Sequence, residues 1–316
     1  MTPCLIIDEM HPSLLPLLAG IGVAGDYQPQ LKAADVPAAL AAQPHTGLIV
    51  RSKLRVTSDL LRHGPHLRYV ARAGAGVDNI DEDALRTAGV ALVNAPEGNR
   101  DAVGEFALGQ LLALLRHSAT ADAQVRRGEW RREANRGEEL GTKTVGLLGY
   151  GHMGRALARR LSGLGCVVLA HDTDPAVRPD GHAALVSLAE LQARAEVLSL
   201  HIPYSPANHE VVNEAFLLAF AHPLWLVNTA RGEVLDHGAL VAGLRSGRVR
   251  GAALDVLDNE KLAALSFVQQ ARFDYLRAAP NVLLSPHVGG WTTQSYARIN
   301  EVLVAKIKAL LTKDKQ

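Results

Sequence analysis

Arg231, the carboxylates of the run Asp255–Glu260, and His287 each stand at or just after the end of an apolar run that we interpret as a β-strand. A histidine can carry a proton at neutral pH, and the planar guanidinium of an arginine can bind a carboxylate or a carbonyl oxygen. Such a set could hold an acid and move a proton while a hydroxyl carbon is oxidised. Each residue alone is a weak indication, because the chain has 13 histidines and most of them must be surface or structural residues.

A glycine-rich turn in the middle of the chain indicates a cofactor for that chemistry. Thr144–Leu148 predicts a strand, Arg155–Leu164 predicts a helix, and between them Gly149, Gly151 and Gly154 have the spacing G-x-G-x-x-G. The first glycine permits a tight turn, the second lets the backbone approach a pyrophosphate, and the third lets the helix pack on the strand. The helix N-terminus then favours the phosphates. The alternative is an ordinary glycine turn, which is common in α/β proteins.

Asp172 supports the cofactor interpretation. It stands 18 residues after Gly154 and follows the apolar run Val167–Ala170, where a dinucleotide site places an acidic residue against the ribose hydroxyls. A carboxylate at this point repels a 2′-phosphate, so we expect NAD rather than NADP. The alternative is that Asp172 is a solvated turn residue before Pro175.

Short apolar runs alternate with helical patterns, which indicates parallel sheets with helices on both faces and an α/β fold. The length of 316 residues suits two such domains. In the first half we expect strands at Cys4–Ile7, Gly47–Val50, Leu67–Ala71 and Val90–Val93, and helices at Pro12–Leu18, Ser58–His63 and Asp81–Ala88. In the second half we expect strands at Thr144–Leu148, Val167–Ala170, Glu196–His201, Trp225–Asn228, Gly251–Asp255 and Val282–Leu284, and helices at Arg155–Leu164, Leu188–Ala193, Asn213–Ala219 and His237–Ser246.

Three further segments have distinctive patterns. Asp101 to Arg127 predicts one long helix that is apolar on much of its circumference, and Arg126–Gly141 predicts a charged, solvated connection. Thr292–Leu311 predicts an amphipathic helix that completes the first domain.

The composition argues against several classes of function. Lys and Arg total 33 against 32 Asp and Glu, and the net charge of +1 gives no reason to expect a nucleic acid or an anionic membrane as partner. We find no membrane-spanning run and no signal peptide, so we expect a cytoplasmic protein. Cys4 and Cys166 have no metal-ligand spacing, and we expect no metal site.

In order and spacing, the segments GYGHMG, NTARG, DVLDNE and SPHVGG resemble the D-isomer-specific 2-hydroxyacid dehydrogenases. In the first half, the segments at 48–52, 71–79 and 94–99 are similar to those of D-3-phosphoglycerate dehydrogenases in particular. The resemblance implies two Rossmann-like domains, with an NAD-binding domain (residues 99–288) inserted in a flavodoxin-like substrate-binding domain (residues 1–98 and 289–316). It also implies a homodimer formed through residues 101–130.

The resemblance also implies the role of each site residue. His287 would be the acid–base group, Glu260 would orient it and stabilise its imidazolium, and Arg231 would bind the carboxylate and polarise the C2 oxygen. Cofactor contacts would come from Gly149, Tyr150, Gly151, His152, Met153, Gly154, Asp172, His201, Pro203, Thr229, Ala230, Asp255 and Gly289. Substrate contacts would come from Arg51, Ser52, Gly76, Val77, Asn99 and Arg100.

The chain departs from the family pattern in three places. The proline usual after Glu260 is replaced by the segment Lys261–Ala279, for which we expect a helix beside the catalytic glutamate. Arg100 stands where a small hydroxyl residue is commoner. The chain ends at Gln316, so we expect no C-terminal regulatory domain.

The substrate remains open among several acids. The first hypothesis is NAD-dependent oxidation of D-3-phosphoglycerate to 3-phosphohydroxypyruvate, the entry to serine synthesis. The alternatives are reduction of glyoxylate, hydroxypyruvate or another 2-keto acid, and an NAD-sensing protein related to the corepressors of this family.

Overall fold

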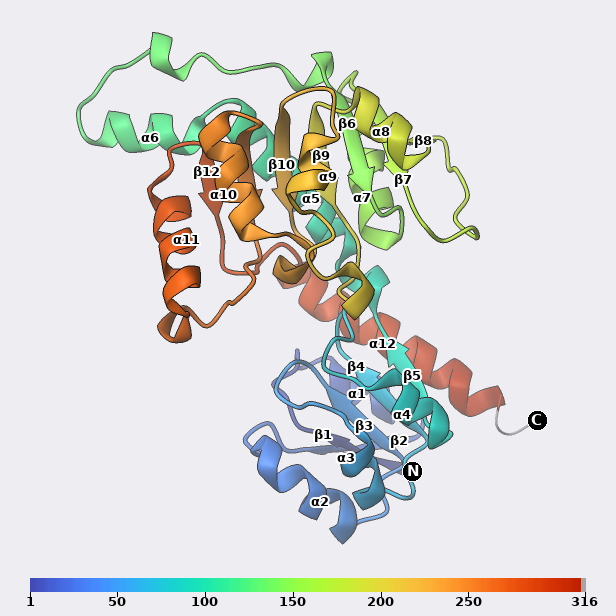
Figure 1. Ribbon diagram of the computed structural model, residues 1–316. Coiled ribbons are helices and arrows are strands. Elements are labelled where there is room, and N and C mark those ends of the chain that lie inside the picture. The colour runs from blue at the N-terminus through green and yellow to red at the C-terminus, as the bar shows by residue number, and fades with distance from the viewer. Residues whose placement is uncertain (314–316) are drawn as a thin grey trace. The chain divides into compact units, whose positions relative to one another are not determined.

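The computed structural model describes residues 1–313, and the chain divides into two compact units. Unit 1 comprises Met1–Asn99 and the segment from Trp291 onward, and unit 2, Arg100–Gly290, is inserted between them. Figure 1 colours the chain from the blue N-terminal part to the red C-terminal helix of unit 1. Each unit is built on a separate parallel sheet, as the alternation of strands and helices predicts.

Unit 1 contains a five-stranded sheet of the order β2-β1-β3-β4-β5, which is the flavodoxin-like order. Its strands, all paired in parallel, are β1 (Thr2–Ile6), β2 (Val23–Tyr27), β3 (Gly47–Val50), β4 (Tyr69–Arg72) and β5 (Ala91–Asn94). One face packs against α1 (Leu14–Ala19) and α12 (Thr293–Lys313), and the other against α2 (Val36–Ala42), α3 (Ser58–His63) and α4 (Glu82–Thr87) (Figure 1). The C-terminal helix therefore completes unit 1, as its amphipathic pattern predicts.

Unit 2 contains a seven-stranded parallel sheet of the order β12-β11-β10-β9-β6-β7-β8. The strands are β6 (Thr144–Leu148), β7 (Val167–His171), β8 (Ala184–Leu185), β9 (Val197–Leu200), β10 (Leu224–Asn228), β11 (Val249–Leu254) and β12 (Val282–Leu284). The chain reverses its direction of travel through the sheet between β6 and β9. Ligands of open α/β sheets bind at such a switch point, at the carboxyl ends of the strands.

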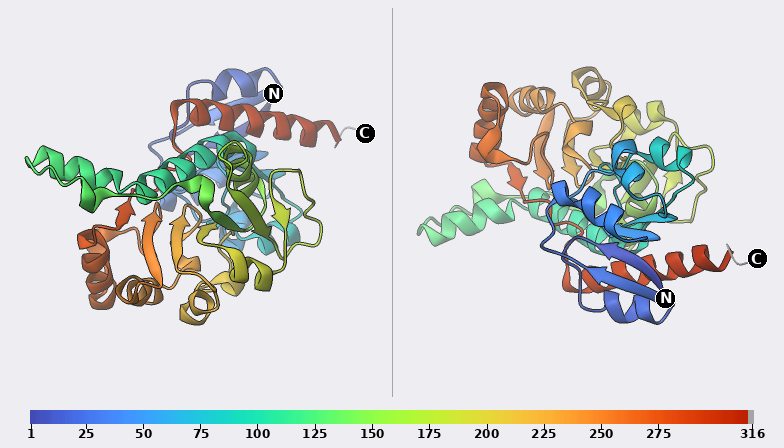
Figure 2. Two further views of the ribbon diagram at one scale, coloured as in Figure 1. Left: turned by 90° about the horizontal axis from the view of Figure 1, so that it is seen from above. Right: turned by 90° about the horizontal axis from the view of Figure 1, so that it is seen from below.

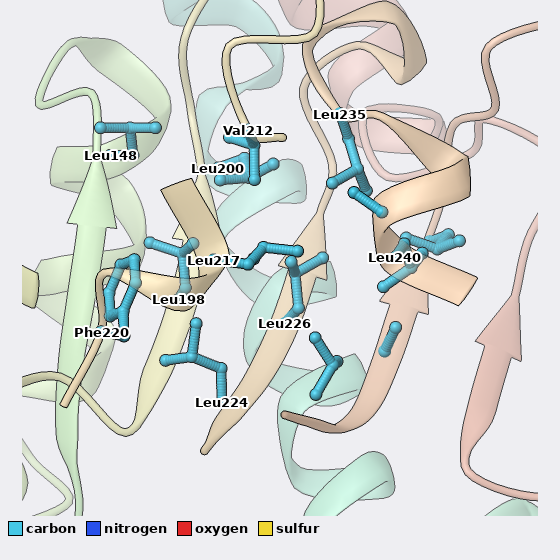
Figure 3. Packing of buried hydrophobic residues seen from close by; sticks show 14 of the residues in the cluster. Leu148, Leu198, Leu200, Val212, Leu217, Phe220, Leu224, Leu226, Leu235 and Leu240 are labelled. Carbon is cyan, nitrogen blue, oxygen red and sulfur yellow. The ribbon is translucent and has the colours of Figure 1, made fainter. Parts of the chain in front are cut away.

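Helices cover both faces of the unit 2 sheet (Figure 2). On one face the buried cluster includes side chains of α8 (Leu188–Arg194), α9 (Glu214–Leu218), α10 (His237–Ser246) and α11 (Phe267–Ala278), part of which Figure 3 shows. On the other face, α5 (Pro96–Leu115) and α7 (His152–Leu161) pack against the sheet. Single 3₁₀ turns lie at Ala33–Asp35, Glu133–Asn135, Leu140–Thr142, Pro206–Asn208, Gly232–Val234 and Leu262–Ala264. Within residues 1–313, no helix is long and apolar enough to cross a membrane.

The prediction of one helix from Asp101 to Arg127 is wrong. The structure has α5, which begins earlier at Pro96, and a separate helix α6 (Ser118–Arg126). Between them His117 has a φ of 52°, in the left-handed region that a right-handed helix cannot include. The buried apolar residues of this stretch end at Leu115 and none lies in α6, so the apolar spacing does not support a helix that continues through the break.

Candidate active site

The glycine turn lies at the end of β6 and leads into α7. Gly149 has a φ of 96°, and a Cβ there would lie 2.6 Å from the carbonyl oxygen of His201. A Cβ on Gly154 would overlap the carbonyl oxygen of Gly149, so these two positions exclude any side chain. Gly151, by contrast, has no atom within 4 Å of its Cβ position, which leaves space for a ligand to approach the backbone just before α7 begins.

Asp172 follows β7 directly and is tied to the glycine turn. Its Oδ2 accepts a hydrogen bond from the backbone N–H of Tyr150 at 2.6 Å, and its Oδ1 accepts one from Asp174 at 2.9 Å. Each carboxylate oxygen retains a lone pair for a further donor, such as a ribose hydroxyl. The Tyr150 side chain is buried and its hydroxyl donates to Asp180 at 2.5 Å, so a cofactor contact from Tyr150 has to come from its backbone.

Two buried polar atoms near the same end of the sheet lack a hydrogen-bond partner within residues 1–313. They are Nδ1 of His201, which follows β9, and the hydroxyl oxygen of Thr229, which follows β10. The other ring nitrogen of His201 lies 2.9 Å from the Ser199 hydroxyl. Burial lowers the pKa of His201 to about 4, so the ring is neutral at pH 7. Buried polar atoms normally have a hydrogen-bond partner. A bound dinucleotide could supply the partners that these two atoms lack.

The turn that carries Arg231 is held by the buried side chain of Asn228. The Asn228 amide donates to the carbonyl of Arg231 at 2.9 Å and accepts from the backbone N–H of Ala230 at 3.0 Å. A Cβ on Gly232 would overlap the backbone of Leu257, so this turn lies directly against the loop after β11. The role of Asn228 was not predicted from the sequence. Its position as a polar residue at the end of an apolar strand was the available indication.

Asp255 is buried after β11, and its carboxylate binds the loop after β12. Its Oδ1 accepts from the hydroxyl of Ser285 at 2.6 Å and from the N–H of Val288 at 3.0 Å, and its Oδ2 accepts from the N–H of Gly289 at 2.7 Å. The N–H of His287 donates to the Asp255 carbonyl at 2.8 Å. Asp255, which the resemblance implies as a cofactor contact, thus holds the loop that carries His287. Its contact with the cofactor stays a prediction.

His287 and Glu260 lie together, as the sequence analysis expected. Nδ1 of His287 is 2.8 Å from Oε1 of Glu260, and both side chains are about half-exposed. His287 has a φ of 55°, a left-handed conformation that is uncommon for residues other than glycine. Strained backbone of this kind persists only where neighbouring contacts impose it, and the hydrogen bonds that the loop donates to Asp255 provide them.

The segment after Glu260 forms the helix that was expected. α11 begins with a capping box, in which the Ser266 side chain accepts from the N–H of Gln269 while the Gln269 side chain accepts from the N–H of Ser266. The Gln269 side chain also lies within 3.4 Å of Asp258 and Asn259. The helix is therefore anchored to the residues that directly precede Glu260.

Several of the expected substrate residues of unit 1 carry N–H groups that donate no hydrogen bond within the described chain. Within residues 1–313, the N–H groups of Gly76 and Val77 and the guanidinium of Arg51 donate no hydrogen bond to the protein. Ser52 is exposed, and the side-chain oxygen of Asn99 is buried without a hydrogen-bond partner in the described chain. Arg100 lies in α5 beside Asp101. Burial acts to raise the pKa of the Asp101 carboxyl, but the hydrogen bond and charge of Arg160, with smaller contributions from Arg159 and Arg100, lower it.

Residues 108–289 match the family model described as the NAD-binding domain of D-isomer-specific 2-hydroxyacid dehydrogenases. The chain is 34% identical to a hydroxypyruvate reductase of Thermotoga maritima, over 82% of this chain and 83% of that protein. It is also 34% identical to a D-3-phosphoglycerate dehydrogenase of Mycobacterium tuberculosis, over 97% of this chain and 56% of the relative, so it spans about half of that protein's length.

The fold agrees with solved structures. A glyoxylate reductase of Paecilomyes thermophila superposes with a TM-score of 0.87 and 25% identity, covering 99% of this chain and 96% of that one. The matched domain contains the glycine turn and Asp172, and its description identifies NAD as the dinucleotide. The chain belongs to the D-isomer-specific 2-hydroxyacid dehydrogenase family.

Proposed function

We propose that the protein is an NAD-dependent dehydrogenase that oxidises a D-2-hydroxy acid at C2, or reduces the corresponding 2-keto acid. The observation that carries this proposal is the 2.8 Å pair of His287 and Glu260 on a loop held by the buried carboxylate of Asp255. A histidine positioned by a carboxylate at the end of a strand suits an acid–base role in a dehydrogenase.

Each residue of the set has a defined task in this proposal. His287 takes the proton of the substrate hydroxyl during oxidation and returns it during reduction. Glu260 holds the ring by Nδ1, which leaves Nε2 for the substrate, and its charge stabilises the imidazolium. Arg231 binds the carboxylate and polarises the C2 oxygen.

The cofactor would be held by the glycine turn, by Asp172 at a ribose, and by the unpaired buried atoms of His201 and Thr229. NAD, when bound, supplies the hydride acceptor of the reaction. We also propose the remaining expected contacts, which are those of His152, Met153, Pro203, Ala230 and Gly289. Gly289 is buried, and its N–H is already bonded to Asp255, so its contact would be one of packing.

For the substrate we propose D-3-phosphoglycerate, oxidised to 3-phosphohydroxypyruvate at the entry to serine synthesis. The N–H groups of Gly76 and Val77 suit a carboxylate, and Arg51 with Ser52 and Asn99 suits a second anionic group. The relative from M. tuberculosis carries the corresponding name. The reductases of hydroxypyruvate and glyoxylate among the similar proteins support the alternative substrates.

Steady-state turnover on a panel of acids tests the proposal. We expect NAD-dependent oxidation of D-3-phosphoglycerate with a kcat/KM well above that for D-lactate or D-glycerate. A phosphoglycerate rate no higher than these two would contradict the phosphate assignment. Absence of turnover on every acid, together with NAD-dependent association with a protein partner, would favour the corepressor-like alternative.

We further propose that the protein is a homodimer formed through residues 101–130. The support is exposed apolar surface in this region: Trp130 is 83% exposed and Val125 is 52% exposed. In both views of Figure 2 the green helix α6 extends away from the sheet of unit 2. Light scattering should give a dimer mass for the wild type and a monomer mass for Trp130→Glu; a monomeric wild type would contradict the proposal.

A further inference from the structure

We propose that Trp291 and Tyr296 are positioning residues for anion recognition. Their rings hold the guanidinium of Arg51, so that its N–H groups stay available for the second anionic group of the substrate. This inference rests on the proposed function in one respect, the assignment of Arg51 to the substrate. The aromatic contacts themselves lie within unit 1 and do not depend on that assignment.

The three side chains form one cluster. The central carbon of the Arg51 guanidinium lies 4.4 Å from the centre of the Trp291 ring and 5.4 Å from that of Tyr296. The two rings contact each other, with centroids 4.9 Å apart and planes tilted by 50°. A cation over aromatic faces is attracted by the ring quadrupoles, and this attraction uses none of its N–H donors.

The backbone of Arg51 is fixed as well. Its N–H donates to Oδ2 of the buried Asp8 at 2.7 Å, and its carbonyl accepts from the amide of Asn79 at 3.1 Å. Arg51 is therefore held at its N–H, at its carbonyl and at its guanidinium. An arginine loses much rotamer freedom when it binds a ligand, and a side chain that is already held loses less.

Residues of the N-terminal segment hold Tyr296 and the start of α12 in place. Its ring meets the ring of His11 edge-on, with centroids 5.4 Å apart. Asn300, one turn further along α12, is buried and donates to the carbonyl of His11 at 3.1 Å and to the hydroxyl of Ser13 at 3.2 Å. The start of α12 is thereby fixed to the loop before α1, and Tyr296 is fixed with it.

The neighbouring cation Lys53 differs from Arg51, because all its N–H donors are bonded within the protein. Its ammonium donates to three carbonyl oxygens, those of Ile7 at 2.7 Å, Pro29 at 2.5 Å and Leu31 at 3.1 Å. Three bonds use all the donors of a lysine. The Arg51 guanidinium makes no hydrogen bond or ion pair within residues 1–313, so its donors can serve a ligand.

Trp291 is the first residue of the C-terminal segment of unit 1. Trp291 stands four residues after His287. Trp291 is also 48% exposed, a large apolar side chain that is not buried in the core and whose ring contacts are those with Arg51 and Tyr296.

The experiment compares KM for D-3-phosphoglycerate with KM for D-glycerate, which lacks the phosphate. Trp291→Leu should raise KM for phosphoglycerate by about 2- to 30-fold, the scale of a cation–π contact, while KM for glycerate and both kcat values change little. Trp291→Phe keeps a ring and should stay close to the wild type. The matched control is Tyr275→Leu, which removes the contact of another arginine, Arg245, 4.7 Å from the Tyr275 ring. It should leave the KM ratio unchanged.

Equal losses on both acids, an unchanged KM ratio in Trp291→Leu, or no rescue by phenylalanine would overturn the inference. Calorimetric titration with inorganic phosphate separates its failure from that of the proposed function. If the wild type prefers glycerate or turns over neither acid, the proposed substrate is wrong. Phosphate binding that is weakened in Trp291→Leu and Arg51→Gln, but not in Tyr275→Leu, then still supports the inference. Phosphate affinity equal in the wild type and Trp291→Leu, or undetectable in both, overturns it.

Discussion

Asp255 and His287 are linked through the backbone: the N–H of His287 donates to the carbonyl of Asp255 at 2.8 Å. The carboxylate of the same aspartate binds the residues on both sides of the histidine, Ser285 before it and Val288 and Gly289 after it. The left-handed φ of 55° at His287 is stabilised by this set of bonds. The direction of the His287 side chain thus depends on a residue of the neighbouring strand.

We therefore expect Asp255→Asn to lower kcat by about 10- to 100-fold, because an amide cannot accept from all three donors and each lost bond to a charged group weakens the loop by about 1.5–3 kcal/mol. Amide hydrogen exchange at Val288 and Gly289 should become faster. Asp258→Asn, nearby but without a bond to this loop, is the control. Normal turnover in Asp255→Asn would show that the loop keeps its shape without the carboxylate.

His287→Gln should reduce kcat by about 10²- to 10⁴-fold, the usual scale for the loss of an acid–base group, and should leave the affinity for NAD intact. Turnover and NAD titration by fluorescence check the two parts separately. A variant that loses NAD affinity and keeps its chemistry would mean that another histidine carries the proton.

Much of the fold could be predicted because buried parallel strands are continuous apolar runs. β3 and β6 lie where their sequences predict, and Arg231, Glu260 and His287 follow strands that are neighbours in the sheet. Glycine spacing predicted the turn after β6 for a steric reason, since two of its positions exclude a side chain.

The missed features depend on tertiary contacts. β2 has the sequence VAGDY and lies at the sheet edge, so it lacks an apolar run. The break at His117 depends on a left-handed backbone conformation, which hydrophobic spacing does not predict. Asn228 and Asp255 hold their loops through bonds to residues of other turns. Trp291 and Tyr296 meet Arg51 only after the C-terminal helix has returned to unit 1, which no local pattern reveals.

The low pKa of His201 predicts a pH dependence of stability. Burial keeps this ring neutral in the folded protein down to about pH 4. In the unfolded chain the ring has the ordinary histidine pKa of about 6.5 and binds a proton below that pH. The contribution is therefore fully present above pH 6.5 and is lost as the pH falls toward 4. Urea unfolding should show a shallower decline of the free energy of unfolding over this range in His201→Gln than in the wild type. The control is His222→Gln, which changes an exposed histidine. If the free energy of unfolding declined with pH equally steeply in both variants, the prediction would be contradicted.

Asp172→Asn should narrow the preference for NAD over NADP by about 10-fold or more, because it removes the charge that repels a 2′-phosphate. Asparagine is the sharper substitution than alanine, since its side-chain oxygen can still accept the N–H of Tyr150 and keep the link to the glycine turn. The matched control is Asp174→Asn, which removes an exposed carboxylate bonded to the N–H of Ala176 two positions further on. The measurement is the ratio of kcat/KM for the two cofactors in each variant. Equal ratios in the wild type and Asp172→Asn would mean that Asp172 is only a turn residue. A similar change of the ratio in Asp172→Asn and Asp174→Asn would indicate a general effect of negative charge and not a contact with the ribose.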